Sequence, residues 1–205
     1  MIALNFELYR PSDMERWIYR LYKISGIEEP SDLADLDYIA SLFNAHIAYT
    51  EGETKAIYDE EGDCLIFLHI HMNQVEQRLA FFHELCHPAM HVGNQHRLPP
   101  SFVNLQEMQA GLFQQYAALP AFMLERFAGT RQQAGEQCSA RDIAEAFMLP
   151  SSFVYARLER MKRRIEQEHQ DQRLRERLAS SSAGAAYSEA TKKLLAKLER
   201  QIKKE

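Results

Sequence analysis

The chain has 205 residues; 46% of them are hydrophobic and 26% are charged, with a net charge of −5. This composition supports a packed core and excludes a wholly disordered chain, and the apolar runs are too short to span a bilayer. The charge is unevenly divided: residues 1–160 carry twelve Lys and Arg against twenty-two Asp and Glu, whereas residues 161–205 carry twelve against seven. An acidic body argues against nucleic-acid binding by bulk charge. The basic tail could contact nucleic acid or an acidic partner, and the alternative is a solvated helix of mixed charge.

The protein is expected to be located in the cytoplasm. Its first residues lack the basic flank and the apolar core of a secretory signal. The three cysteines, Cys64, Cys86 and Cys138, are odd in number and do not form a disulfide framework, which fits a reducing compartment.

Two helices are predicted first, over 12–25 and 32–44, because apolar residues recur there at helical spacing behind a capping serine. The pattern then changes to three strands over 45–50, 54–59 and 64–70, separated by short acidic segments that contain glycine. Short connections of this kind favour antiparallel neighbours. We therefore expect a small antiparallel meander of three strands.

The next helix is predicted over 73–92, because Asn73 with Glu76 three residues later is close to a capping box. A long helix is then predicted from about residue 101 or 104 to 119, followed by one or two helical turns over 121–127 and a polar loop over 129–138. After the loop we expect a helix–turn–helix pair over 139–148 and 151–170. The chain ends with a flexible break over 180–186 and a last helix from about 188.

The helix over 73–92 contains His83-Glu84-Leu85-Cys86-His87, an H-E-x-x-H motif. Histidines four residues apart lie on one helix face, so both can give an imidazole nitrogen to a single Zn²⁺. Glu84 lies beside them, where it can take a proton from a metal-bound water as that water attacks a carbonyl. The alternative is a surface helix with two incidental histidines.

A catalytic zinc needs a third protein ligand and an open fourth position. Glu107 is the preferred candidate, because an antiparallel helix can bring its carboxylate to the metal. Ala110 and Gly111 lie on the same stripe and are expected to let the two helices approach closely. His96, in the intervening loop, is the alternative ligand, and Glu107 would then be an ordinary exposed helix residue.

Five other residues near the motif have weaker or simpler roles. Tyr116 or His71 could stabilise the oxyanion of a tetrahedral intermediate, although Tyr116 falls on the helix face opposite the acid and fits the core. His91 lies about two turns beyond the first histidine, too far to share its ion. Cys86 is interpreted as a small buried apolar residue. Pro88 removes one helix hydrogen bond and should kink or widen the helix.

These residues resemble the ImmA/IrrE family of zinc metallopeptidases, more narrowly its branch in phages and mobile elements of Gram-positive bacteria. The resemblance is carried by FFHELCHPAMH and LQEMQAGLFQQYAALPAFML and is strongest over 65–124. It implies a compact zincin-like fold, with Glu84 as the catalytic acid and base and with His83, His87 and Glu107 as metal ligands. It also implies proteolysis of a helix-turn-helix repressor that controls a mobile element or DNA-damage genes.

We therefore predict an α+β, zincin-like fold in three parts: a metallopeptidase domain over 1–130, a helix-turn-helix-like module over 139–170, and a basic, partly flexible helical tail over 171–205. The predicted function is zinc-dependent cleavage of a specific protein, most simply such a repressor, without a membrane partner. The alternative is a non-catalytic regulator or toxin–antitoxin component in which zinc only stabilises the fold. Glu84 argues against it, because a structural zinc site needs no general base.

Overall fold

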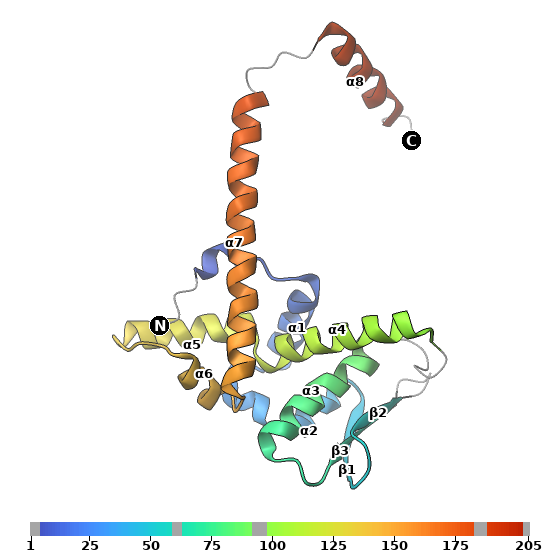
Figure 1. Ribbon diagram of the computed structural model, residues 1–205, viewed down its shortest axis with the longest axis vertical. Helices are drawn as coiled ribbons and strands as arrows, with labels where there is room; N and C mark the ends of the chain where they lie inside the picture. The colour runs from blue at the N-terminus through green and yellow to red at the C-terminus, as the bar shows by residue number, and fades with distance from the viewer. Residues whose placement is uncertain (1–4, 59–62, 92–97, 183–187, 203–205) are drawn as a thin grey trace.

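The structure is a computed structural model that describes residues 5–58, 63–91, 98–182 and 188–202 (Figure 1). Its elements in chain order are η1 (Phe6–Leu8), α1 (Asp13–Ile24), η2 (Pro30–Ala34), α2 (Leu36–Ser41), β1 (Ala45–Thr50), β2 (Lys55–Tyr58), β3 (Cys64–His69), α3 (Gln74–Met90), α4 (Pro100–Ala118), α5 (Ala121–Gln133), α6 (Ala140–Ala146), α7 (Ser151–Ser182) and α8 (Glu189–Ile202). Helices that pack against one face of a small sheet confirm the α+β class. Among the described helices, none combines the length and apolar character needed to cross a membrane.

The sheet is mixed, and the prediction of an antiparallel meander is wrong for its first strand. The strand order is β1-β3-β2: β1 runs parallel to β3, and β2 runs antiparallel to it. The β3 strand takes the centre because its alternate residues Ile66 and Leu68 are completely buried. The β2 strand has only four residues and leaves Ile57 54% exposed, which suits an edge. The antiparallel pairing of β2 with β3 agrees with the prediction.

Helix boundaries differ from the sequence pattern at three places. The predicted helix over 32–44 is divided into η2 and α2, because Asp35 leaves the helical region and its carboxylate caps the N–H of Tyr38. The α5 helix extends to Gln133, so the first half of the predicted polar loop is helical. The α7 helix continues to Ser182, past its predicted end at about 170 and into the break predicted over 180–186. Residues 183–186 of that break lie outside the described residues.

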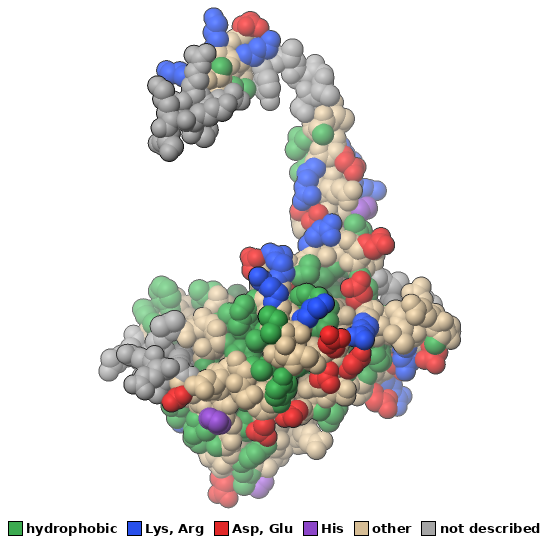
Figure 2. Space-filling view, turned by 180° about the vertical axis from the view of Figure 1, so that it is seen from behind, with side chains coloured by type: hydrophobic (Ala, Val, Ile, Leu, Met, Phe, Trp, Pro, Cys, Tyr) green, Lys and Arg blue, Asp and Glu red, His purple; other side chains and the backbone are tan. Residues whose placement is uncertain are grey.

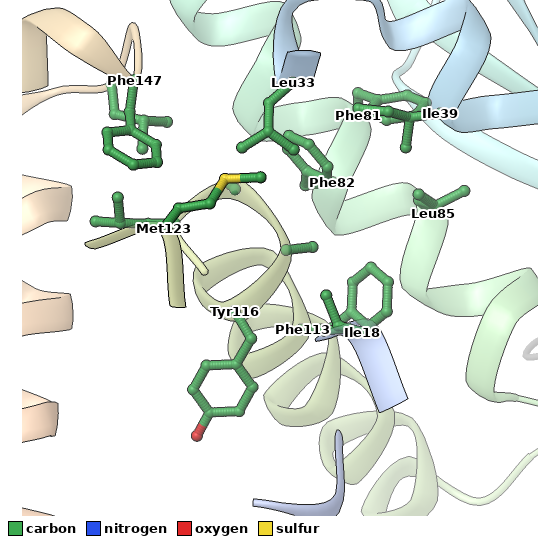
Figure 3. Packing of buried hydrophobic residues seen from close by; sticks show 14 of the residues in the cluster. Ile18, Leu33, Ile39, Phe81, Phe82, Leu85, Phe113, Tyr116, Met123 and Phe147 are labelled. Atoms are coloured by element: carbon green, nitrogen blue, oxygen red, sulfur yellow. The ribbon is translucent and has the colours of Figure 1, made fainter. Parts of the chain in front are cut away.

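One apolar core joins the sheet to the helices, including the part of the chain beyond residue 139 (Figure 3). The α3 helix contributes Phe82 and Leu85, and α4 contributes Phe113; all three are buried. Phe147, which follows α6, and Val154 of α7 are completely buried in the same cluster. The packing therefore fixes α3 and α4 against the sheet, and it fixes the base of α7 against the same body.

A buried charge network attaches α7 to the amino-terminal segment. Arg157 has no exposed surface, and its Nη2 lies 2.6 Å from Oε1 of Glu15 on α1. Its remaining donors reach the Tyr9 hydroxyl and the Leu119 carbonyl, each at 3.3 Å. Arg164, two turns further along α7, contacts the other oxygen of Glu15 at 2.9 Å. Every charge buried here therefore has a partner, as burial requires.

Beyond this anchor α7 projects from the body as a single helix, and α8 lies at its far end (Figure 1). The distal part of α7 is exposed, including Leu174 and Leu178. In Figure 2 Lys and Arg side chains gather where α7 leaves the body, above a region of hydrophobic surface.

Candidate metal centre

Three side chains that could hold a metal ion converge between α3 and α4. His83 and His87 come from α3 and Glu107 comes from α4, and one ligand atom of each lies within 4.8 Å of the others. The two histidines share a face because they are four residues apart, with ring centroids separated by 5.6 Å. The sequence therefore named three residues that the structure brings together.

The distances among these atoms fit the ligand set of a zinc ion. Nε2 of His83 lies 3.1 Å from Oε2 of Glu107, and Nε2 of His87 lies 3.7 Å from Oε1 of the same carboxylate. Tetrahedral ligands at zinc bond lengths of about 2.0–2.1 Å are separated by about 3.3 Å. Two imidazoles and one carboxylate are also donors that zinc accepts, and they leave one of four positions open.

Burial prepares His87 to act as a ligand. Its side chain is 7% exposed, and burial lowers its pKa to about 4, although the charge of Glu107 opposes that shift. The imidazole is therefore neutral near pH 7, which is the form that binds a metal. His83 is more open, with a side chain that is 28% exposed.

The Glu84 carboxylate lies under the edge of the sheet. The backbone N–H of Ala56, on the edge strand β2, donates to its Oε2 at 2.9 Å. Burial raises the pKa of Glu84 and the nearby Glu107 carboxylate adds to the rise, while the neighbouring His83 imidazole and the Ala56 hydrogen bond partly oppose it. A half-buried carboxylate that is held at one oxygen and has a raised pKa is suited to accept a proton.

Other histidines near the motif lie outside the cluster. Nε2 of His91, the C-cap of α3, is 3.0 Å from Oε1 of Gln109, and its ring packs against His87. His71 is exposed, and its ring lies 5.4 Å from that of His69. His96, the alternative ligand, lies outside the described residues.

Tyr116 lies in the core rather than at the metal centre. Its ring is 6% exposed and packs under the guanidinium of Arg157, 4.6 Å from the ring centroid. Nine residues separate it from Glu107, about 13 Å along a helix axis. The role in stabilising an oxyanion therefore has no geometric support here.

The sequence also gave expectations for Cys86, Pro88 and Gly111. Cys86 is completely buried, and burial raises its pKa to about 12, so it behaves as an apolar thiol. Pro88 does not end α3, which continues to Met90. The expected close approach at Gly111 is wrong, because a Cβ there would meet nothing within 4 Å.

Two contacts that position the site were not foreseen from the sequence. Gln114 donates to the Leu79 carbonyl at 2.7 Å and so fixes α4 against the first half of α3. The Ala56 N–H reaches Glu84 because β2 is an edge strand, with backbone groups that face away from β3. A backbone donor leaves no signature in a sequence, whereas Gln114, seven residues after Glu107 and on the same stripe, did offer one.

The chain is similar to several known proteins. The family model Peptidase M78, described as the IrrE N-terminal-like domain, matches residues 41–187. The chain is 32% identical over 154 residues to the phage-like element PBSX protein XkdA of Bacillus subtilis (strain 168), which covers 75% of each protein. It is 26% identical over 159 residues to the uncharacterized protein YqaB of the same strain, covering 78% of this chain and 90% of the relative.

Among solved structures, a Mycobacterium tuberculosis transcriptional regulator aligns with a TM-score of 0.48 at 14% identity. The alignment covers 70% of this chain and 46% of that one.

Proposed function

Because the chain belongs to the ImmA/IrrE family of metallopeptidases, Peptidase M78, we propose that it is a zinc-dependent endopeptidase. The observation that carries this proposal is the position of Glu84 beside three convergent ligands, with one carboxylate oxygen held by a backbone N–H. A zinc site that only stabilised the fold would have no use for a carboxylate there and would close its fourth position. The geometry therefore favours catalysis over the non-catalytic alternative.

In this proposal His83, His87 and Glu107 hold the zinc and leave its fourth position to water or substrate. Zinc, when bound, lowers the pKa of a water ligand towards about 7 and polarises a carbonyl. Glu84 accepts the proton of the attacking water and then delivers it to the departing amine nitrogen. The Ala56 N–H occupies Oε2 of Glu84, so Oε1 is the oxygen left for this proton transfer.

The substrate that we propose is a helix-turn-helix repressor of a mobile element or stress regulon. Two points support it: the resemblance of the motif region to peptidases that inactivate such repressors, and a relative whose name places it in a phage-like element. Such a substrate also favours a cytoplasmic location for the enzyme.

The test uses the purified zinc-loaded protein and any helix-turn-helix repressor that is found to be encoded next to its gene. Fragments are identified by mass spectrometry for the wild type, for Glu84→Gln and for the matched surface control Glu125→Gln, which lies on the exposed side of α5. We expect Glu84→Gln to keep its zinc but to lose about 10²–10⁴ in rate, while the control cleaves normally. Near-normal cleavage by Glu84→Gln would show that another group activates the water.

A further inference from the structure

A large open groove lies between α7 on one side and α4 with the start of α1 on the other. Its volume is about 970 Å³. The residues that α7 contributes extend from Tyr155 to Gln167, a length of about 18 Å at 1.5 Å per residue. Its α4 wall begins at Gln109, the residue whose amide contacts His91 beside the metal cluster. Gln109 therefore connects one end of the groove to the His91 side of the candidate metal centre, while most of the α4 wall lies on the helix face turned away from Glu107.

The walls of the groove are apolar at several points and polar around them. Met14, Leu112 and Ala156 contribute apolar surface, and Tyr155 adds a ring that is 60% exposed. A helix about 10 Å wide occupies about 120 Å³ per residue, so this volume accommodates about two turns of one. A groove between two helices, with apolar surface and a polar border, is the setting in which amphipathic helices dock.

The charges at its border favour an acidic occupant. Arg160 bonds the neutral amide of Gln115 at 2.9 Å, and no carboxylate of the described residues lies within ion-pair distance of Arg163. Arg164 shares the single carboxylate of Glu15 with the buried Arg157, and Asp13 pairs with Arg16.

Glu159 then remains as a single carboxylate against two uncompensated guanidiniums. The positive surplus is local, because residues 1–160 are acidic as a whole.

We propose that this groove is a docking site for an amphipathic helix with acidic border residues, carried by the protein substrate. The inference rests on the proposed function: a helix held there attaches the substrate to the body close to Gln109 and His91, so that a neighbouring segment of the same protein can reach the metal cluster. Nucleic acid fits less well: the two arginines face a concave wall and share it with Glu159. A binding site at a distance from the cleaved bond gives a peptidase selectivity for one protein.

The test is a binding selection that needs no cleavage. The zinc-loaded Glu84→Gln protein is presented with an mRNA-displayed library of 14-residue helices that have leucine at i, i+3, i+4 and i+7. Each border position carries either Glu or Lys, and a matched sublibrary has proline at its centre. We expect Glu to be enriched over Lys about fivefold to tenfold, as two partly exposed ion pairs allow, and the proline sublibrary to be depleted.

The matched variants are Arg160→Glu/Arg163→Glu in the groove and Arg173→Glu/Arg175→Glu on the projecting part of α7. We expect the first pair to abolish or invert the Glu preference and the second pair to leave it unchanged. Three outcomes would overturn the proposal: equal recovery of library members with Glu and with Lys at the border positions, recovery of the proline sublibrary, or the same preference for Glu in both variants. So would binding of a 30-base-pair DNA duplex that is lost only in the groove variant.

Cleavage of the repressor by the two variants in the active Glu84 background separates this inference from the proposed function. With an intact groove site, Arg160→Glu/Arg163→Glu should raise KM for the whole repressor by about fivefold to tenfold, and leave kcat/KM for a short peptide across the cleaved bond unchanged. An equal effect on both substrates would refute the groove but not the peptidase. No cleavage by the wild type would refute the peptidase, while the binding selection would still stand as a result about the groove.

Discussion

The Arg157→Met substitution keeps most of the aliphatic volume of a completely buried side chain and removes its guanidinium. The Glu15 carboxylate loses its partner at 2.6 Å, and the Tyr9 hydroxyl and the Leu119 carbonyl each lose a donor at 3.3 Å. Breaking a buried ion pair from one side costs about 3–5 kcal/mol. Because Arg164 still contacts Glu15, we expect the lower end, about 3 kcal/mol of unfolding free energy.

For a protein of this size, about 3 kcal/mol corresponds to a fall in Tm of roughly 6–12 °C. Thermal and urea unfolding, followed by circular dichroism on zinc-loaded protein, measure it. The exposed Arg163→Met is the control and should change stability by less than about 0.5 kcal/mol. The double variant Glu15→Met/Arg157→Met should recover part of the loss, since no buried charge is left without a partner. A loss below about 1 kcal/mol for Arg157→Met, or no recovery in the double variant, would refute this reasoning.

Three further predictions concern the metal, the tail and pH. Glu107→Ala should lose its zinc and its activity, Glu107→Gln should retain part of the zinc, and His96→Ala should retain all of it. Metal analysis that finds zinc in Glu107→Ala and none in His96→Ala would show that the three ligands are all histidines. Truncation after Gln170 should leave zinc content and Tm unchanged, because the projecting part of α7 is exposed; insolubility of that chain would contradict this. Burial raises the pKa of Glu15, but Arg157 and the Tyr9 hydrogen bond outweigh it and lower the pKa below 4.5. The stabilisation from this carboxylate should therefore be complete above about pH 4.5 and be lost as pH falls through the lower folded-state pKa; a stability gap between wild type and Glu15→Gln that stays constant down to pH 2 would contradict it.

The sequence was sufficient wherever a local pattern decides the outcome. Two histidines four residues apart on a capped helix must share a face, whatever the rest of the fold does. The capping box predicted at Asn73 is present, with Glu76 returning to its N–H. Glu107 was predicted as the third ligand because an antiparallel helix can bring its carboxylate to the two histidines, and that carboxylate lies 3.1 Å from Nε2 of His83.

Only the tertiary structure decided what depends on competition between distant segments. The β3 strand is central in the sheet because its inward residues are the most completely buried. The short β1–β2 connection favoured pairing of β1 with β2 and gave no sign of this. Arg157 reads in the sequence as one more exposed helix arginine, yet it is the buried partner of Glu15, 142 residues away. Local spacing fixes which side chains share a helix face. Strand order and the burial of a charge depend instead on the whole core, because each arrangement is stable only if it has a lower free energy than the other packings open to the same segments.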